Sequence, residues 1–298
     1  MGSQATSSRA TWLNGELWRD GEVPPASAAV MHDRGFVLGD GLFETILIRH
    51  ALPVLWKEHL VRMAATADAL HFPLPAAFDD AARNAAEALL EAVDDASREH
   101  GTLRITVTRG SGTAFGLDAP TEPLPTVLVR LTPASRRSRA YADRETAWIV
   151  DQPRIDPNSL LSGHKTTSSM WRVLAHETAR SHGAELALLK TLDGDVAEAD
   201  SACLFAVIDG EVATPPLTRG ILPSTTRGFI IEELAAAHRP AQERMLSSEQ
   251  LAAASEVIIS SSVSGIRPLR ALDGGPLPEA APVAEWLEAR YEAIEGGF

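Results

Sequence analysis

The stretch Gly163-His164-Lys165-Thr166-Thr167 contains one of only three lysines in a chain of 298 residues. Lysine and arginine together number 27, so the other 24 basic residues are arginine. Arginine keeps its charge at any working pH, whereas a lysine amine can lose its proton and attack a carbonyl carbon. A reactive amine is therefore scarce in this protein.

The setting of Lys165 distinguishes it from the other two lysines. A stretch rich in Pro, Asn, Ser and Gly (157–163) leads to it, and a helix is predicted over 167–182. Nucleophiles are often held at such junctions. Lys57 begins an amphipathic helix and Lys190 lies where a strand runs into a turn, and both are ordinary surface settings. The pattern favours Lys165 as the candidate for a Schiff base, with a solvated ammonium group as the alternative.

The composition is that of a globular protein that does not bind nucleic acid. Apolar residues make up 45% of the chain and charged residues 22%, and the formal net charge of −13 opposes a nucleic-acid surface. The single cysteine, Cys203, excludes an internal disulfide and fits a reducing compartment. The start has no apolar run typical of a signal peptide, and the histidines lack the HExxH spacing of a zinc site. We expect a cytoplasmic protein with no metal and no membrane partner.

The predicted elements alternate between helices and strands and fall into two domains. In the first half they are a hairpin around Asn14-Gly15, strands over 45–49, 103–109 and 127–131, and helices over 58–70 and 78–100. The polar, basic segment 132–140 lacks periodicity and is the predicted linker. It separates a small N-terminal domain (9–131) from a larger C-terminal domain (141–298).

Hydroxyl residues open a predicted helix in the second half. That half also contains two Asp-Gly hairpins, a strand and a closing helix, predicted over 186–198, 204–213, 256–263 and 281–294. Ser224, Thr225 and Thr226 stand at the start of a helix predicted over 226–238. Such hydroxyls either cap the helix or, together with its free backbone N–H groups, form an anion site.

Seven segments in order resemble the class IV (fold type IV) enzymes that depend on pyridoxal 5'-phosphate (PLP). This family includes branched-chain and D-amino-acid aminotransferases, R-selective amine transaminases and aminodeoxychorismate lyase. The segments are Asp33-Arg34-Gly35 with Gly39-Asp40-Gly41, His59-Leu60-Val61-Arg62, Lys165, Gly194 to Glu198, Thr214-Pro215-Pro216, Gly220 to Arg227, and Ser260 to Pro268. The resemblance implies a mixed α/β (α+β) fold of two domains, PLP in the cleft between them, and a homodimer.

The resemblance also implies roles for individual residues. Lys165 matches the Schiff-base lysine, which later acts as the general base at the substrate Cα. Glu198 matches the acid that pairs with the pyridine nitrogen and keeps it protonated. The implied phosphate-binding residues are Arg62, Thr225, Thr226 and Ser262. Cys203 stands where many relatives have asparagine, and we interpret it as a small apolar substitute.

Substrate binding is where this sequence departs from its relatives. D-amino-acid aminotransferases and the lyase commonly have a carboxylate-binding arginine about where Ala114 stands. Arg34 and Arg109 are the remaining candidates for that carboxylate. The candidate residues for an apolar pocket wall are Phe36, Phe43 and Phe115.

The implied activity is a two-step transamination between an amino acid or primary amine and a 2-keto acid. The alternative is a lyase that releases pyruvate and forms 4-aminobenzoate, which Lys165-Thr166-Thr167 and Gly220-Ile221-Leu222-Pro223 slightly favour and Ala114 opposes. A binding protein or hydrolase without PLP is a remote third possibility, and no Gly-x-Ser-x-Gly motif is present. The handedness of the donor and the identity of the keto acceptor stay open.

Overall fold

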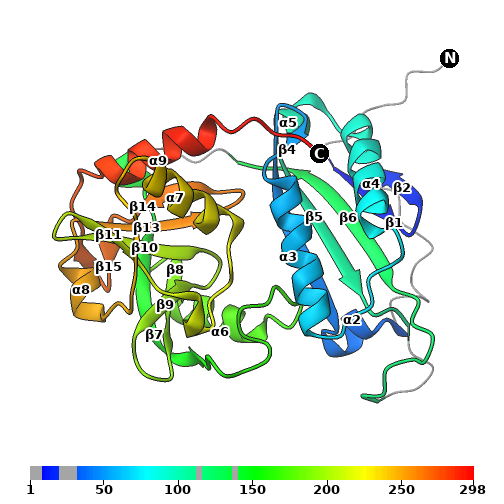
Figure 1. Ribbon diagram of the computed structural model, residues 1–298, viewed down its shortest axis with the longest axis horizontal. Helices are drawn as coiled ribbons and strands as arrows, with labels where there is room; N and C mark the ends of the chain where they lie inside the picture. Colours follow the sequence, from blue (N-terminus) through cyan, green and yellow to red (C-terminus); the bar gives the residue numbers. More distant parts are fainter. Residues whose placement is uncertain (1–8, 20–31, 112–115, 136–139) are drawn as a thin grey trace. The chain divides into compact units, whose positions relative to one another are not determined.

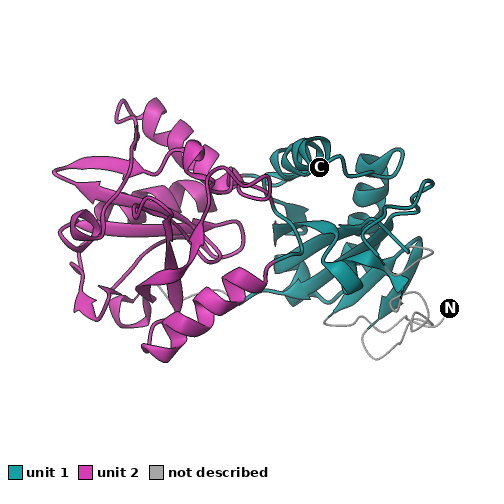
Figure 2. Cartoon of the chain, turned by 90° about the horizontal axis from the view of Figure 1, so that it is seen from below, with its two compact units in different colours: residues 1–136, 165–168, 295–298 teal, residues 137–164, 169–294 magenta. Residues whose placement is uncertain are grey.

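The computed structural model describes residues 9–19, 32–111, 116–135 and 140–298, which form two compact units (Figure 2). Unit 1 comprises Met1–Arg136, Lys165–Ser168 and Glu295–Phe298, and unit 2 comprises Arg137–His164 and Ser169–Ile294. The division falls inside the predicted linker. The Lys165 segment belongs to the N-terminal unit although it lies in the C-terminal half of the chain, which a linear pair of domains does not anticipate.

Unit 1 is built on an antiparallel sheet of six strands in the order β2-β1-β6-β5-β3-β4 (Figure 1). The strands are β1 (Ala10–Leu13), β2 (Glu16–Arg19), β3 (Gly41–Arg49), β4 (Leu52–Pro53), β5 (His100–Thr108) and β6 (Thr126–Pro133). The helices are α2 (Arg34–Leu38), α3 (Trp56–Ala69), α4 (Phe78–Ala92) and α5 (Asp95–Glu99). Alternation decides the layers, because Leu103 and Ile105 are buried in the core with α3 and α4 while Arg104 points to the opposite face.

Two predicted elements of unit 1 differ from the structure. The helix predicted over 78–100 ends at Ala92, and a separate short helix follows, because the Asp94 side chain accepts a hydrogen bond from Ser97 N at 2.9 Å and caps a new start. The segment before the strand predicted over 45–49 contains a helical turn, α2, which Asp33 caps in the same way. Strand β3 then begins at Gly41, four residues earlier than predicted.

Unit 2 contains two sheets of five strands, in the orders β12-β11-β10-β13-β14 and β16-β15-β7-β8-β9. The strands are β7 (Thr146–Ile155), β8 (Leu186–Thr191), β9 (Val196–Ala199), β10 (Cys203–Ile208), β11 (Glu211–Thr214), β12 (Gln242–Glu243), β13 (Glu256–Ser261), β14 (Gly265–Pro268), β15 (Ala271–Leu272) and β16 (Gly275–Pro276). The helices are α6 (Met170–Ser181), α7 (Thr225–Ala236), α8 (Ser248–Ala252) and α9 (Pro282–Glu292), with single turns at Tyr141–Asp143 and Leu217–Arg219.

Helix α6 connects the parallel strands β7 and β8 and packs on both of them. Ala175 and Ala179 are fully buried at this contact, and their small side chains let the helix lie close to the sheet. The chain between β7 and α6 contains the Lys165 segment. No helix in the ranges that the structure describes is long and apolar enough to cross a membrane.

Candidate active site

The backbone of Lys165 is hydrogen-bonded to the start of β3 within unit 1. Phe43 N donates to Lys165 O at 3.1 Å, and Thr167 N donates to Gly41 O at 2.8 Å. The Thr167 hydroxyl donates to Gly39 O at 2.7 Å. This close approach requires glycine at position 41, where a Cβ atom would lie 3.0 Å from the Thr167 hydroxyl. The candidate nucleophile is therefore carried on a fixed segment.

The amine of Lys165 lies over an aromatic ring. Its Nζ atom is 4.3 Å from the centre of the Phe43 ring, and the guanidinium carbon of Arg104 is 3.7 Å from the same centre. Lys57 is exposed, and Lys190 forms an ion pair with Asp151 at 2.9 Å. Lys165 is thus the lysine whose amine lies against an aromatic ring, and its role as the Schiff-base lysine stays a prediction.

A buried cluster of charged side chains lies on the core face of β3. Glu44 Oε1 accepts from Arg62 Nε at 2.8 Å, Glu44 Oε2 accepts from Arg62 Nη2 at 2.5 Å, and His59 Nδ1 is 2.7 Å from Glu44 Oε2. The Glu44 and His59 side chains are 1% exposed and that of Arg62 is 9% exposed. The structure therefore places the predicted phosphate ligand Arg62 in a bidentate pair with Glu44, which holds its guanidinium in one orientation.

The cluster combines an ionised carboxylate with a neutral imidazole. Burial alone would raise the pKa of Glu44, but the charge of Arg62 and the hydrogen bonds from His59 and Arg62 outweigh it and lower the pKa to about 2. Burial lowers the pKa of His59 below its usual 6.5, against the opposing hydrogen bond to Glu44. The positive charge of Lys165 acts on His59 in the same direction as burial.

The cluster predicts that the protein loses stability in acid in two stages. A lowered pKa means that the unfolded chain binds the proton more tightly than the folded one. His59 therefore costs stability as the pH falls below 6.5, and the Glu44 contribution, about 3 kcal/mol, is lost between pH 4.5 and about 2. Urea unfolding measured between pH 7.5 and pH 2 should show both stages, and a His59→Gln variant should flatten the upper one. An unchanged slope in that variant would contradict the assignment to His59.

The start of α7 fits an anion in unit 2. Ser224 caps the helix, its side chain accepting from Arg227 N, so Thr225 and Thr226 are not needed as caps. The Thr226 hydroxyl is fully buried and has no hydrogen-bond partner among the residues that the structure describes. Thr225 Oγ1 is 3.3 Å from Ser262 Oγ, so two of the predicted phosphate donors lie together. An unsatisfied buried hydroxyl at a helix N-terminus is the chemistry that a phosphate group would complete.

Glu198 and Cys203 lie on strands β9 and β10, which follow each other along the chain but belong to the two different sheets of unit 2. Glu198 on β9 is 3% exposed, and its Oε2 accepts from Leu222 N at 3.2 Å while its Oε1 accepts from Arg172 Nη2 at 2.5 Å. The Cys203 sulfur on β10 lies 2.7 Å from Ser260 Oγ, and burial raises the pKa of this thiol. The cysteine is thus a buried thiol in its protonated form, which agrees with its interpretation as a small apolar substitute.

The two arginines predicted to bind a substrate carboxylate are joined by Asp40. Arg34 Nε donates to Asp40 at 2.8 Å, and Arg109 Nε donates to it at 3.0 Å. Arg34 also donates to the carbonyl of Asp118 at 2.9 Å, and Arg109 donates to the carbonyl of His71 at 3.2 Å. Both guanidinium groups therefore already hold acceptors of unit 1, and their role toward substrate stays a prediction.

The three phenylalanines predicted to form an apolar pocket wall have different surroundings. Phe36 lies on α2 and is 74% exposed. Phe43 lies under Lys165, as described above. Phe115 and Ala114 lie outside the described residues.

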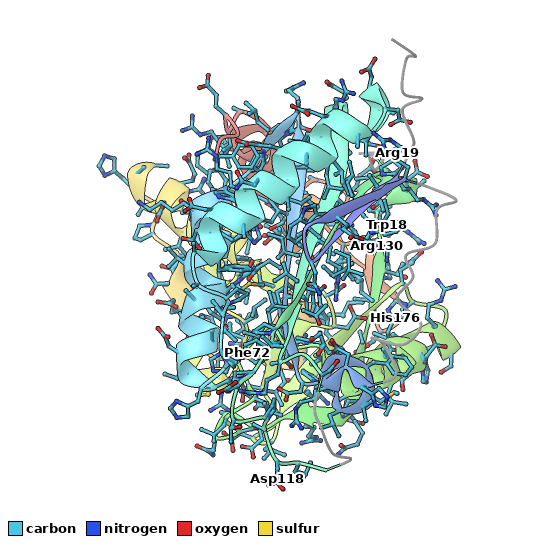
Figure 3. The ribbon with its side chains drawn as sticks, turned by 90° about the vertical axis from the view of Figure 1, so that its right-hand side faces the viewer. Trp18, Arg19, Phe72, Asp118, Arg130 and His176 are labelled. Carbon is cyan, nitrogen blue, oxygen red and sulfur yellow. The ribbon has the colours of Figure 1, made fainter. Side chains whose placement is uncertain are left out.

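One group of candidate residues was missed from the sequence. The strand register puts five residues opposite one another across β2, β1, β6, β5 and β3, so that they point to one face of the sheet: Trp18, Thr11, Arg130, Arg104 and Thr45. Figure 3 labels Trp18 and Arg130 on this face. Within the described residues, neither arginine forms an ion pair with an acid, and the buried Nε1 of Trp18 has no hydrogen-bond partner. The alternating pattern of β5 and β6 predicts outward side chains here, but only the strand register puts the two arginines together.

Like charges directly opposite each other destabilise a sheet. Partial burial is the larger of two causes that lower the pKa of Arg104, and the positive charge of Arg130 is the smaller one. Arg104 also shares the Phe43 ring with Lys165. The face therefore carries excess positive charge next to the candidate nucleophile, which suits a negatively charged group of a bound molecule.

The fold is shared with solved aminotransferases. A branched-chain aminotransferase from the archaeon Thermoproteus uzoniensis superposes with a TM-score of 0.84 at 21% identity, over 95% of this chain and 93% of that one. A 4-amino-4-deoxychorismate lyase from Pseudomonas aeruginosa superposes with a TM-score of 0.77 at 27% identity, over 95% and 99%. The predicted mixed α/β fold is confirmed by this likeness.

The family is shown by the sequence comparison. The family model for class IV amino-transferases matches residues 41–272, so the chain belongs to the class IV aminotransferases. It is 28% identical to a branched-chain-amino-acid aminotransferase of Salmonella typhimurium, over 96% of this chain and 93% of that protein. It is 27% identical to a D-alanine aminotransferase of Staphylococcus aureus, over 94% and 96%. The predicted family is thereby confirmed.

Proposed function

We propose that the protein is a PLP-dependent aminotransferase that moves an amino group between an amino acid or primary amine and a 2-keto acid. The observation that carries the proposal is the position of Lys165, which is fixed by its backbone against β3 of unit 1 with its amine over Phe43. Membership of the class IV aminotransferases supports the same conclusion.

PLP, when bound, supplies an aldehyde for a lysine amine and a ring that takes up the electrons left when Cα loses a proton. Lys165 is the residue we propose to hold it and to move that proton. Glu198 would accept the hydrogen bond from the ring nitrogen. The phosphate would accept hydrogen bonds from Arg62, Thr225, Thr226 and Ser262. The observation that fits a phosphate is the buried Thr226 hydroxyl, which has no hydrogen-bond partner among the described residues.

We propose Arg104 and Arg130 as the residues that bind a substrate carboxylate. They lie on the sheet face next to Lys165 and pair with no acid of the described part of the chain, whereas Arg34 and Arg109 already hold Asp40 and backbone carbonyls. A carboxylate between two guanidinium groups would relieve their mutual repulsion. This arrangement favours amino acids over uncharged amines as donors.

The Arg104→Ala variant is expected to bind amino-acid donors more weakly. A hydrogen bond to a charged group contributes about 1.5–3 kcal/mol, so the KM for the amino acid should rise roughly ten- to hundred-fold. The KM for 1-phenylethylamine, which has no carboxylate, and the uptake of PLP should change little. Arg83→Ala is the control, because Arg83 forms an exposed pair with Glu87. Equal effects on both donors would argue against a carboxylate site at Arg104.

The first test of the proposed function is the visible spectrum of the purified protein with PLP and single amino donors. A yellow band that one donor bleaches, with release of the matching keto acid, establishes transamination and the handedness of the donor. D-Alanine and L-leucine are the first donors to try, since the similar proteins are named for D-alanine and branched-chain amino acids. Failure to take up PLP would overturn the proposal.

A lyase is the second candidate, and the likeness to a 4-amino-4-deoxychorismate lyase favours it. Its expected result is different: a yellow protein that no donor bleaches and that releases pyruvate from aminodeoxychorismate. We further propose a homodimer in the cytoplasm, the first on the family resemblance and the second on the single cysteine, which fits a reducing compartment. Light scattering of the PLP-loaded protein tests the dimer.

A further inference from the structure

Glu198 is held by contacts that unit 2 itself supplies. Its carboxylate is buried at the end of the short strand β9, and each oxygen has one donor: Leu222 N at 3.2 Å and Arg172 Nη2 at 2.5 Å. No other cation pairs with Glu198 in the described part of unit 2. A buried carboxylate needs such a partner, since an uncompensated charge in the interior is strongly unfavourable.

Arg172 is anchored on three sides. It lies in the first turn of α6, and its guanidinium carbon is 4.3 Å from the centre of the Trp171 ring. Its Nη1 donates to the carbonyls of Ala199 at 3.3 Å and Asp200 at 3.0 Å, the residues that follow Glu198. The side chain is 25% exposed, so water screens the pair only in part. The guanidinium thus clamps the end of β9 as well as the carboxylate.

The end of β9 is itself fixed. Asp200 is buried, and its carboxylate accepts from Ala187 N at 3.1 Å and lies 2.8 Å from His176 Nδ1 on α6. Helix α6 therefore contacts this turn through both Arg172 and His176. Because backbone and side chains are both held, Glu198 has one orientation available to it.

We propose that Arg172 is a positioning residue that holds the Glu198 carboxylate in the orientation that pairs with the pyridine nitrogen of PLP. The inference rests on the proposed function, because the partner of Glu198 is the cofactor. Without Arg172 the buried carboxylate would retain only Leu222 N as its donor, and it would rotate. This change weakens the acceptor for the ring nitrogen and leaves the phosphate site of α7 untouched.

The test compares PLP with an analogue that has carbon in place of the pyridine nitrogen. Arg172→Met is expected to weaken PLP binding by about tenfold or more and to leave binding of the analogue unchanged, because only PLP uses Glu198. Arg172→Lys should recover part of the loss, since it restores the charge but not the fork of donors. Arg180→Met, an exposed position on the same helix, is the matched control. Binding is measured by absorbance titration of the cofactor-free proteins.

Three results would overturn the inference. Wild-type affinity of Arg172→Met for PLP would show that the clamp does not act on the cofactor. Equal weakening of PLP and of the analogue would show damage to the whole site. Additive effects of Arg172→Met and Glu198→Gln on PLP affinity would show that the two residues act independently.

Failure of the proposed function gives a different result, because the wild-type protein would then bind neither compound. The clamp is still tested in that case by thermal unfolding of the cofactor-free protein. Arg172→Met should lower Tm, and adding Glu198→Gln should restore most of the loss by removing the buried charge. A double variant as unstable as Arg172→Met alone would overturn the ion-pair role itself.

Discussion

Replacement of Lys165 with arginine is expected to abolish amino-group transfer and the yellow colour of the PLP-loaded protein. Arginine keeps the positive charge and much of the length of lysine, but its guanidinium cannot lose a proton to act as nucleophile or base. Loss of the proton transfer alone should cost about 10²–10⁴-fold in rate. The initial rate of keto-acid formation and the visible spectrum measure both effects.

The other two lysines of the chain are matched controls for this variant. Lys57→Arg should be neutral because Lys57 is exposed, and Lys190→Arg should be neutral because arginine preserves the pair with Asp151. Borohydride reduction of the PLP-loaded protein, followed by peptide mass spectrometry, should place the cofactor mass on Lys165. Cofactor mass on Lys57 or Lys190, or full activity in Lys165→Arg, would contradict the assignment.

Replacement of Glu44 with glutamine is expected to lower the free energy of unfolding by about 3–5 kcal/mol. Glutamine keeps the shape of the side chain but removes its charge, so the buried Arg62 guanidinium would lose the carboxylate with which it forms a bidentate pair. At roughly 2–4 °C of Tm for each kcal/mol, the change should be plain in thermal unfolding followed by circular dichroism. The measurement uses the cofactor-free protein, so that Arg62 has no phosphate to bind.

Two further variants make the Glu44 result specific. Glu87→Gln breaks the exposed pair with Arg83 on α4 and should cost only about 0.3–0.5 kcal/mol. Adding Arg62→Met to Glu44→Gln should recover much of the lost stability, since the uncompensated charge is removed. A loss in Glu44→Gln no larger than that in Glu87→Gln would show that burial of the pair contributes little.

The Lys165→Arg and Glu44→Gln variants are expected to affect different properties, activity and stability, although both act next to β3. Phe43 contacts the Lys165 amine on one face of β3, and Glu44, the next residue, points into the core on the other. Consecutive residues of a strand point to opposite faces. The candidate lysine Lys165 therefore lies against one face of β3, and the charged cluster of Glu44, His59 and Arg62 lies on the other. Lys165→Arg should therefore leave stability unchanged, and Glu44→Gln should lower it.

The family and the candidate cofactor residues could be predicted from the sequence, because their signals are local. Lys165 is conspicuous through the scarcity of lysine, and the hydroxyl run from Ser224 to Thr226 marks a helix start. Which hydroxyl caps that helix was not predictable. The structure assigns the cap to Ser224, and the Thr226 hydroxyl has no hydrogen-bond partner among the described residues. Which hydroxyl becomes the cap depends on the path of the chain into α7.

The amino-acid order alone indicated most of the helices and strands, the candidate lysine and the family, because periodicity, scarcity and motif spacing are properties of the chain itself. Only the tertiary structure decided which charges meet. Arg104 and Arg130 lie 26 positions apart, as do Arg172 and Glu198, and each pairing depends on strand register or on how α6 packs. The sequence does not distinguish one arginine from another. The groups that the fold places beside each guanidinium decide whether we expect it to hold a loop, orient a carboxylate or bind a substrate.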